Sequence, residues 1–248
     1  MSRITSEPGE QETGSLDAVF LYMGILDAYE AVGIELIGPK VLDEHVLPRM
    51  VYYVKEFLPE IFTGREDMSL LVNELKDFLV EFKNKVEAAR VKGHAENLSK
   101  EDIWKLRAAI FGFESVFIKI LGDSAIKNYV FGRIADILSA YLPDRLMNPD
   151  ISLQEKLQDY GNYLKEHKFV GYARTTVGKD GITIATNKCE FSRIHDSDAY
   201  RNLDVRFCPW GMIGSAIVAA HEGRATNLES SVFTTKGSVS KIGSRVTE

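Results

Sequence analysis

The chain has 248 residues, 45% of them hydrophobic and 27% charged, which is the composition of an ordinary globular protein and excludes disorder, collagen and a pure coiled coil. Its 36 acidic and 30 basic residues give a net charge of −6, so nucleic acid is not expected as a partner. Two cysteines are too few for a secreted disulfide framework, and the N-terminus carries no apolar signal sequence. The longest nearly unbroken apolar run, 211–220, is about half the roughly 18 residues of a transmembrane helix. We therefore expect a cytoplasmic protein with no membrane span.

The first two thirds of the chain are predicted to be helical. Residues 1–14 are polar and aperiodic, which is typical of a flexible tail. From residue 15 to about residue 166, apolar residues recur at spacings of three and four, as in Val46, Met50 and Val54. This period predicts amphipathic helices.

Two short patterns indicate where helices begin. Ser152, with Glu155 three residues later, has the form of a capping box. Ser99 and Asp102 form a weaker version of the same pattern. The preceding polar stretch, 92–100, is expected to be a loop between two helical halves.

These two halves resemble each other when the first is shifted along the chain so that Gly38 falls on Gly122. The same offset aligns Val46 with Val130, and it also matches Glu30 with Glu114, Val32 with Val116, Ile34 with Ile118 and Leu58-Pro59 with Leu142-Pro143. Matched Gly and Leu-Pro positions go beyond shared helical periodicity and favour an internal duplication, although two amphipathic segments could also agree by coincidence. Two copies are too few for a solenoid, which needs about three repeats.

After about Lys168 the sequence becomes rich in β-branched residues. Segments 170–177 and 181–187 predict a hairpin with a glycine-bounded turn. Residues 190–206 are expected to be a loop or an irregular strand. A helix is predicted over 212–221, ending at Gly223, and it is followed by short strands at 226–233 and 238–242. Helices followed by antiparallel strands indicate an α+β fold.

The second half resembles the 4-vinyl-reductase domain family. The resemblance covers about Phe111 to Ile242 and is carried by Ile120-Leu121-Gly122, the hairpin, the Asn187, Cys189 and Phe191 element, and Cys208-Pro209-Trp210-x-x-x-Gly214 opening a helix. That family shares its fold with the heme nitric-oxide-binding domain and the TRAPP trafficking subunits. The resemblance implies an α+β ligand domain over 99–248, preceded by a helical region over 15–98, and often a homodimer.

The family's zinc site looks lost in this chain. Cys208 and Glu229 match the pattern, but the later cysteine positions fall near Val232 and Ser240, and the turn is Lys236-Gly237. We therefore expect neither a metal nor a cofactor.

The cysteines have two further possible uses. Zinc prefers thiolate and imidazole ligands. The candidates are Cys189, His195, Cys208 and His221, but they do not form the close pairs that structural zinc sites usually have. A Cys208 nucleophile is another possibility, because a helix N-terminus lowers a thiol pKa. Its general base would be His221, about 20 Å away at the other end of the helix. The alternative to both uses is that the two cysteines are small buried residues with a structural role only.

The leading hypothesis is a non-catalytic protein that binds a small apolar or aromatic molecule. Aromatic residues at helical spacing usually belong to the core, but the resemblance to the family implies that these residues line a pocket. The expected ligand-binding residues are Phe113, Phe117, Phe191, Cys208, Trp210 and Ile213. The small residues around Gly211 and Gly214 permit close approach, either to a ligand or to the sheet.

Two other functions remain open. One is a dimeric adaptor that resembles the trafficking subunits, with exposed apolar helix faces in place of a cavity. The other is an enzyme, for which no catalytic residue is placed by spacing: no phosphate loop, nucleophile elbow or dinucleotide fingerprint is present.

Overall fold

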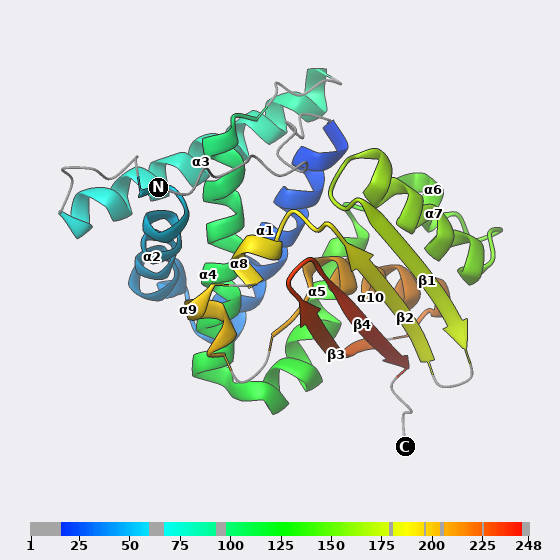
Figure 1. Ribbon diagram of the computed structural model, residues 1–248. Coiled ribbons are helices and arrows are strands. Elements are labelled where there is room, and N and C mark those ends of the chain that lie inside the picture. Colours follow the sequence, from blue (N-terminus) through cyan, green and yellow to red (C-terminus); the bar gives the residue numbers. More distant parts are fainter. Residues whose placement is uncertain are drawn as a thin grey trace, which may run out of the picture.

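The computed structural model describes residues 16–59, 67–92, 98–178, 181–195, 197–203, 206–224 and 226–244. The fold is α+β, as predicted: a helical region is followed by a four-stranded antiparallel sheet (Figure 1). The expected tail 1–14, the turn residues 179–180 and most of the expected loop 92–100 lie outside the described residues.

Ten α-helices and two π-helical turns are described. In the first half they are α1 (Leu16–Leu36), η1 (Leu42–Val46), α2 (Leu47–Phe57) and α3 (Met68–Lys92). The second half has α4 (Lys100–Ala125), η3 (Ile126–Val130), α5 (Phe131–Ser139), α6 (Asp144–Met147) and α7 (Leu153–Glu166), and later α8 (Ser192–His195), α9 (Asp198–Arg201) and α10 (Pro209–Glu222). None of the described helices combines the length and the apolar character that crossing a membrane requires.

Three predicted helix ends are confirmed. Ser152 and Glu155 form a complete capping box at the start of α7. Ser99 and Asp102 exchange the same two bonds before α4, at 3.2 and 3.0 Å. Gly223 ends α10 with φ of 63°, a left-handed conformation that glycine adopts without strain.

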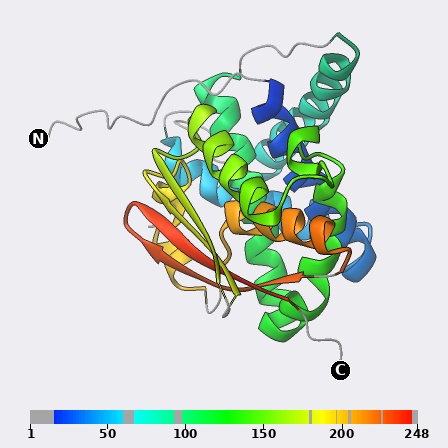
Figure 2. The ribbon, with the colours of Figure 1, turned by 90° about the vertical axis from the view of Figure 1, so that its right-hand side faces the viewer.

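The sheet contains β1 (Tyr172–Gly178), β2 (Gly181–Asn187), β3 (Thr226–Thr234) and β4 (Gly237–Ser244) in the order β1-β2-β4-β3. Helix α10 packs against β3 and β4, and α7 packs against β1 (Figure 2). Ile182, Ile184, Leu228 and Ile242 are buried in the sheet. A Cβ at Gly211 would lie 2.7 Å from Cβ of Ser240, so the small residues of α10 allow its backbone to approach the sheet.

Two sequence predictions in the C-terminal third were wrong in detail. Residues 190–206 contain the short helices α8 and α9, because Phe191, Ile194 and Tyr200 are buried and the Ser197 hydroxyl accepts a hydrogen bond from the Tyr200 amide at 3.3 Å. Helix α10 begins at Pro209, three residues before the predicted start, because proline is favoured in the first helical turn.

The two helical halves share local features at positions that the offset of Gly38 to Gly122 brings together. Gly38 and Gly122 themselves both have positive φ, of 121° and 74°. Each is followed by a π-helical turn, at 42–46 and 126–130, and then directly by α2 or α5. These irregular features do not follow from amphipathic periodicity.

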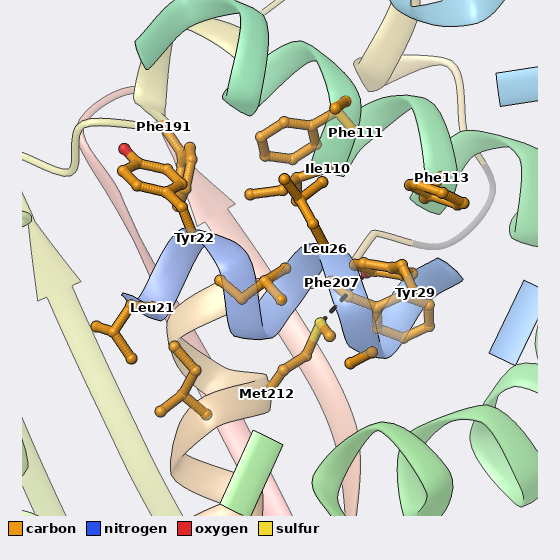
Figure 3. Packing of buried hydrophobic residues seen from close by; sticks show 14 of the residues in the cluster. Leu21, Tyr22, Leu26, Tyr29, Ile110, Phe111, Phe113, Phe191, Phe207 and Met212 are labelled. Carbon is orange, nitrogen blue, oxygen red and sulfur yellow. Dashed lines mark hydrogen bonds between the residues drawn. The ribbon is translucent and has the colours of Figure 1, made fainter. Parts of the chain in front are cut away.

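The packing of the two halves also follows this offset. Tyr29 of α1 stacks on Phe113 of α4, its equivalent in the second half, with ring centroids 5.9 Å apart (Figure 3). One turn further on, a Cβ at Gly33 would lie 3.3 Å from the ring of Phe117, its partner at the same offset. Helix α2 packs on α4, and α5 packs on α1. The contacts are therefore approximately reciprocal, as in an isologous interface.

Gly211→Ala is expected to destabilise the protein by about 1–3 kcal/mol, because the added methyl group meets Ser240 and overpacks the contact between α10 and β4. Gly132→Ala in α5 is the matched control. Its Cβ meets nothing within 4 Å, so the gain in helix propensity should leave stability equal or higher. Urea denaturation measures both; equal effects of the two substitutions would contradict the tight packing at Gly211.

Candidate functional site

A buried cluster of aromatic rings joins α1 and α4 to the C-terminal segment. The Phe191 ring lies 5.4 Å from Phe111 and 6.3 Å from Tyr22, measured between centroids (Figure 3). It also lies 5.1 Å from the ring of Trp210. The structure therefore brings together two of the predicted ligand-binding residues, Phe191 and Trp210, with Cys208 two positions before the latter. All of these side chains are buried.

The two cysteines are held as buried thiols. The Trp210 indole N–H donates to Sγ of Cys189 at 3.3 Å, and the Ser238 hydroxyl donates to Sγ of Cys208 at 3.0 Å. Burial raises the pKa of both thiols. At Cys208 burial outweighs the lowering that its place before α10 suggested, so this thiol is a poor nucleophile at neutral pH.

Other predicted residues lie in a neighbouring group. Phe113 and Phe117 pack with Tyr29 between α1 and α4. The Tyr29 hydroxyl donates to Sδ of Met212 at 3.4 Å, which connects this group to α10 beside the buried Ile213 (Figure 3).

A buried ion pair fixes the aromatic cluster. Nη2 of Arg107 lies 2.6 Å from Oε2 of Glu190, and the side chains are 10% and 3% exposed. The Tyr22 hydroxyl donates to the other carboxylate oxygen at 2.9 Å. These three residues connect α1, α4 and the chain before α8. Removing one partner of a buried ion pair leaves an unpaired charge and is costly, so this connection holds the three segments together.

A second buried carboxyl, Glu114, has only one oxygen bonded. Its Oε1 accepts from the Tyr200 hydroxyl at 2.5 Å and from the Phe207 amide at 2.7 Å, whereas Oε2 has no partner within the described residues. Burial raises the pKa of Glu114 to about 8, and the hydrogen bonds and the charge of Arg206 offset this only in part. The carboxyl is therefore mainly protonated at neutral pH.

The imidazole ring of His195 is also buried. Neither ring nitrogen has a partner among the described residues, and the ring packs 5.3 Å from Tyr200 and 4.2 Å from Phe233. Burial lowers the pKa of His195 to about 3, with a smaller contribution from Arg206. A neutral acid and a neutral base thus flank Tyr200. Shifted titratable groups of this kind are characteristic of functional sites.

The sequence interpretation missed Arg107, Glu114 and Tyr200. A signal existed for Glu114, because it is the one charged residue in the stretch 108–118, which is otherwise mostly apolar. Nothing local indicated its partners, since Tyr200 is 86 residues away.

The candidate metal ligands do not form a cluster. Cys208 and His221 occupy opposite ends of α10, as predicted, and His221 is exposed. Within the described ranges, no group of three or more His, Cys, Asp or Glu side chains could hold a metal ion.

A separate apolar cavity of about 70 Å³ lies between the first helical half and α4. Its lining is Leu26, Glu30, Leu42, Lys76, Leu79, Val80, Phe82, Lys83 and Phe113. Lys83 is ion-paired with Glu30, and Lys76 lies 2.8 Å from Asp43. Phe113 is thus a predicted ligand-binding residue that borders a cavity.

Comparisons with protein-family models, with curated proteins and with solved structures gave no match for this chain. The fold and site define an α+β protein with titratable groups buried in an aromatic core. The resemblance to the 4-vinyl-reductase family stays a prediction.

Glu114 is expected to make stability depend on pH. The folded carboxyl keeps its proton up to about pH 8, whereas the unfolded one loses it near 4.5, so stability falls as pH rises through this window, by at most about 1.4 kcal/mol per pH unit. His195 acts in the opposite direction. Its pKa is about 3 in the folded protein and 6.5 in the unfolded one, so the protein loses stability as the pH is lowered below 6.5.

The substitution Glu114→Gln should therefore flatten the stability profile between about pH 6.5 and 8, where His195 is neutral in both states. Urea denaturation of wild type and variant across this range measures the difference. Parallel profiles would contradict a protonated Glu114 in the folded protein.

Proposed function

We propose that this protein binds a small apolar or aromatic molecule without chemical change, at the cavity that Phe113 borders. The observation that carries the proposal is the lining of this cavity. Six apolar side chains from α1, η1, α3 and α4 surround it, and the three charged residues of the lining are Glu30, Lys76 and Lys83. Such a mixture of apolar walls and few polar groups is typical of small-molecule sites.

The size of the cavity limits the ligand. At about 70 Å³ it is well below the roughly 300 Å³ or more of sites for drug-sized molecules. It therefore suits a small ring or one end of a longer apolar molecule. Side chains of Lys76 and Lys83 are 44% and 37% exposed, so they lie toward solvent, where a polar group of the ligand would remain.

The resemblance to the 4-vinyl-reductase family agrees with this class of ligand. Phe117 supports the cavity through its contact with Phe113. The other predicted residues, Phe191, Cys208, Trp210 and Ile213, do not line the cavity, and we assign them to the core that holds α4 in place.

We also propose that the helical region arose by duplication, as the shared turns and reciprocal contacts suggest. In this arrangement α1, α2 and α3 occupy the place of a second subunit against α4 and α5. The cavity then lies where the first copy meets the second.

Val80→Phe is expected to abolish ligand binding, because Val80 borders the cavity and is 53% exposed, so a larger side chain closes the entrance. Benzene is the probe, and thermal unfolding is the measurement. Binding should raise the Tm of the wild type by about 2–4 °C for each kcal/mol of stabilisation.

The matched control is Val91→Phe, also on α3, at a position that is 89% exposed and outside the cavity. It should retain the benzene response. A wild type that shows no response, or a Val80→Phe variant that responds like the wild type, would refute binding at this cavity.

A dimeric adaptor is the second candidate function. It is favoured by three exposed apolar side chains near the ends of α1 and α4, namely Ile34, Leu36 and Ile120, which are 44–47% exposed. Leu36 and Ile120 are again equivalent positions of the two halves. Apolar side chains at such positions are typical of a protein-binding surface.

If this surface forms a homodimer, Leu36→Glu should dissociate it, because the new charge would be buried in the interface. Val91→Glu is the control and should leave the assembly unchanged. Sedimentation velocity measures both, and a wild type that is monomeric at all concentrations would argue against the homodimer.

A further inference from the structure

Helix α3 forms one wall of the apolar cavity, and α1, η1 and α4 form the rest. The lining residues that α3 supplies are Lys76, Leu79, Val80, Phe82 and Lys83. Leu79 and Phe82 are buried, whereas the other three are at least partly exposed. These three, Lys76, Val80 and Lys83, are spaced by four and three residues, so they lie along one side of the helix. They form the rim of the cavity on its solvent side.

Two ion pairs join this rim to the opposite wall. Nζ of Lys76 lies 2.8 and 2.9 Å from the two carboxylate oxygens of Asp43 in η1. Nζ of Lys83 pairs with Oε2 of Glu30 in α1, and Oδ1 of Asp27, about one turn before Glu30, lies 3.9 Å from the same nitrogen. Because Lys76, Lys83 and Glu30 all line the cavity, both pairs lie at its edge.

The entrance of the cavity lies between these two pairs. Val80 is 53% exposed and is about one turn from each lysine along α3. A molecule that passes Val80 needs room between α3 and the opposite wall, and both ion pairs resist that separation. The paired side chains of Lys76, Asp43, Lys83 and Glu30 are 26–51% exposed. Ion pairs with this exposure are weak and are screened by salt, so they can open and close.

We propose that the Lys76–Asp43 and Lys83–Glu30 pairs are a latch that closes the apolar cavity and sets the rate at which its ligand enters and leaves. This inference rests on the binding function proposed above. The latch joins the same residues with and without ligand, so weakening it speeds association and dissociation equally and leaves the affinity unchanged. A group that contacts the ligand would change the affinity instead.

Fluorobenzene is the probe, because it has nearly the size of benzene and carries a fluorine nucleus. On the full chain, a fluorine NMR titration gives the Kd and exchange spectroscopy gives the dissociation rate. The ratio of this rate to the Kd is the association rate.

Asp43→Asn removes the first pair without changing a lining residue, and Glu30→Gln weakens the second. Each should raise the dissociation rate about 1.5- to fivefold, the effect expected from the loss of a partly exposed ion pair. The double variant should exceed either. For Asp43→Asn the association rate should rise by the same factor, so that the Kd equals that of the wild type.

Glu44→Gln is the matched control. It is the neighbour of Asp43 in η1, it removes the same charge, and it breaks the exposed pair with Lys40 at 3.3 Å, but it does not line the cavity. Its exchange rates should equal those of the wild type. Asp43 and Glu44 are both about half exposed, so neither substitution should disturb the fold.

Salt provides a second measurement. Raising sodium chloride from about 0.1 to about 1 M shortens the Debye length from about 10 to about 3 Å and weakens the latch of the wild type. The difference in dissociation rate between wild type and double variant should therefore narrow. Comparison at equal salt removes any effect of salt on the solubility of the probe.

The outcomes separate the latch from the binding function. Wild-type rates in both Asp43→Asn and the double variant overturn the latch and leave the binding function intact. The latch is also overturned if Asp43→Asn changes the Kd at an unchanged association rate, or if Glu44→Gln speeds exchange as much as Asp43→Asn. A wild type that does not bind fluorobenzene overturns both the latch and the binding function.

Discussion

The burial of α4 is the constraint on which the rest of the structure depends. Residues 106–118 of this helix are buried on every side, including its polar side chains. Because a buried polar group needs a hydrogen-bond partner, Arg107 pairs with Glu190, and the buried Tyr53 hydroxyl of α2 bonds to Ser115. These requirements fix where α2 and the segment before α8 must lie. Glu114 is the exception, with one oxygen unpaired among the described residues, and it marks the place where polar pairing is incomplete.

The apolar cavity and the buried titratable groups lie in different parts of the structure. The cavity lies where the first helical half meets α4, so its shape depends on packing between helices. Its lining includes neither Glu114 nor His195, whose shifted pKa values change the stability of the fold with pH. Binding at the cavity can therefore be measured apart from the titration of these two groups.

Much of the fold could be predicted because its signals are local. Periodicity identified the helices, Ser152 and Glu155 marked a helix start, and β-branched residues marked the strands. The candidate site was harder to predict. Phe191 and Trp210 do meet, but the partners of Arg107 and Glu114 are distant in the chain, and no local pattern selects them. The cavity depends on α3, which sequence reasoning treated only as part of a separate helical region.

Glu30 and Glu114 show how one residue type can meet two different environments. They lie at positions of α1 and α4 that the offset of Gly38 to Gly122 matches. Glu30 is partly exposed and ion-paired with Lys83, whereas Glu114 lies beneath Tyr200 and Phe207 and keeps its proton near neutral pH. The difference comes from the covering chain and not from the glutamate itself. The chain packed over Glu114 is thus what keeps its carboxyl protonated near neutral pH, while a glutamate at the matched position of α1 forms an ion pair at the surface.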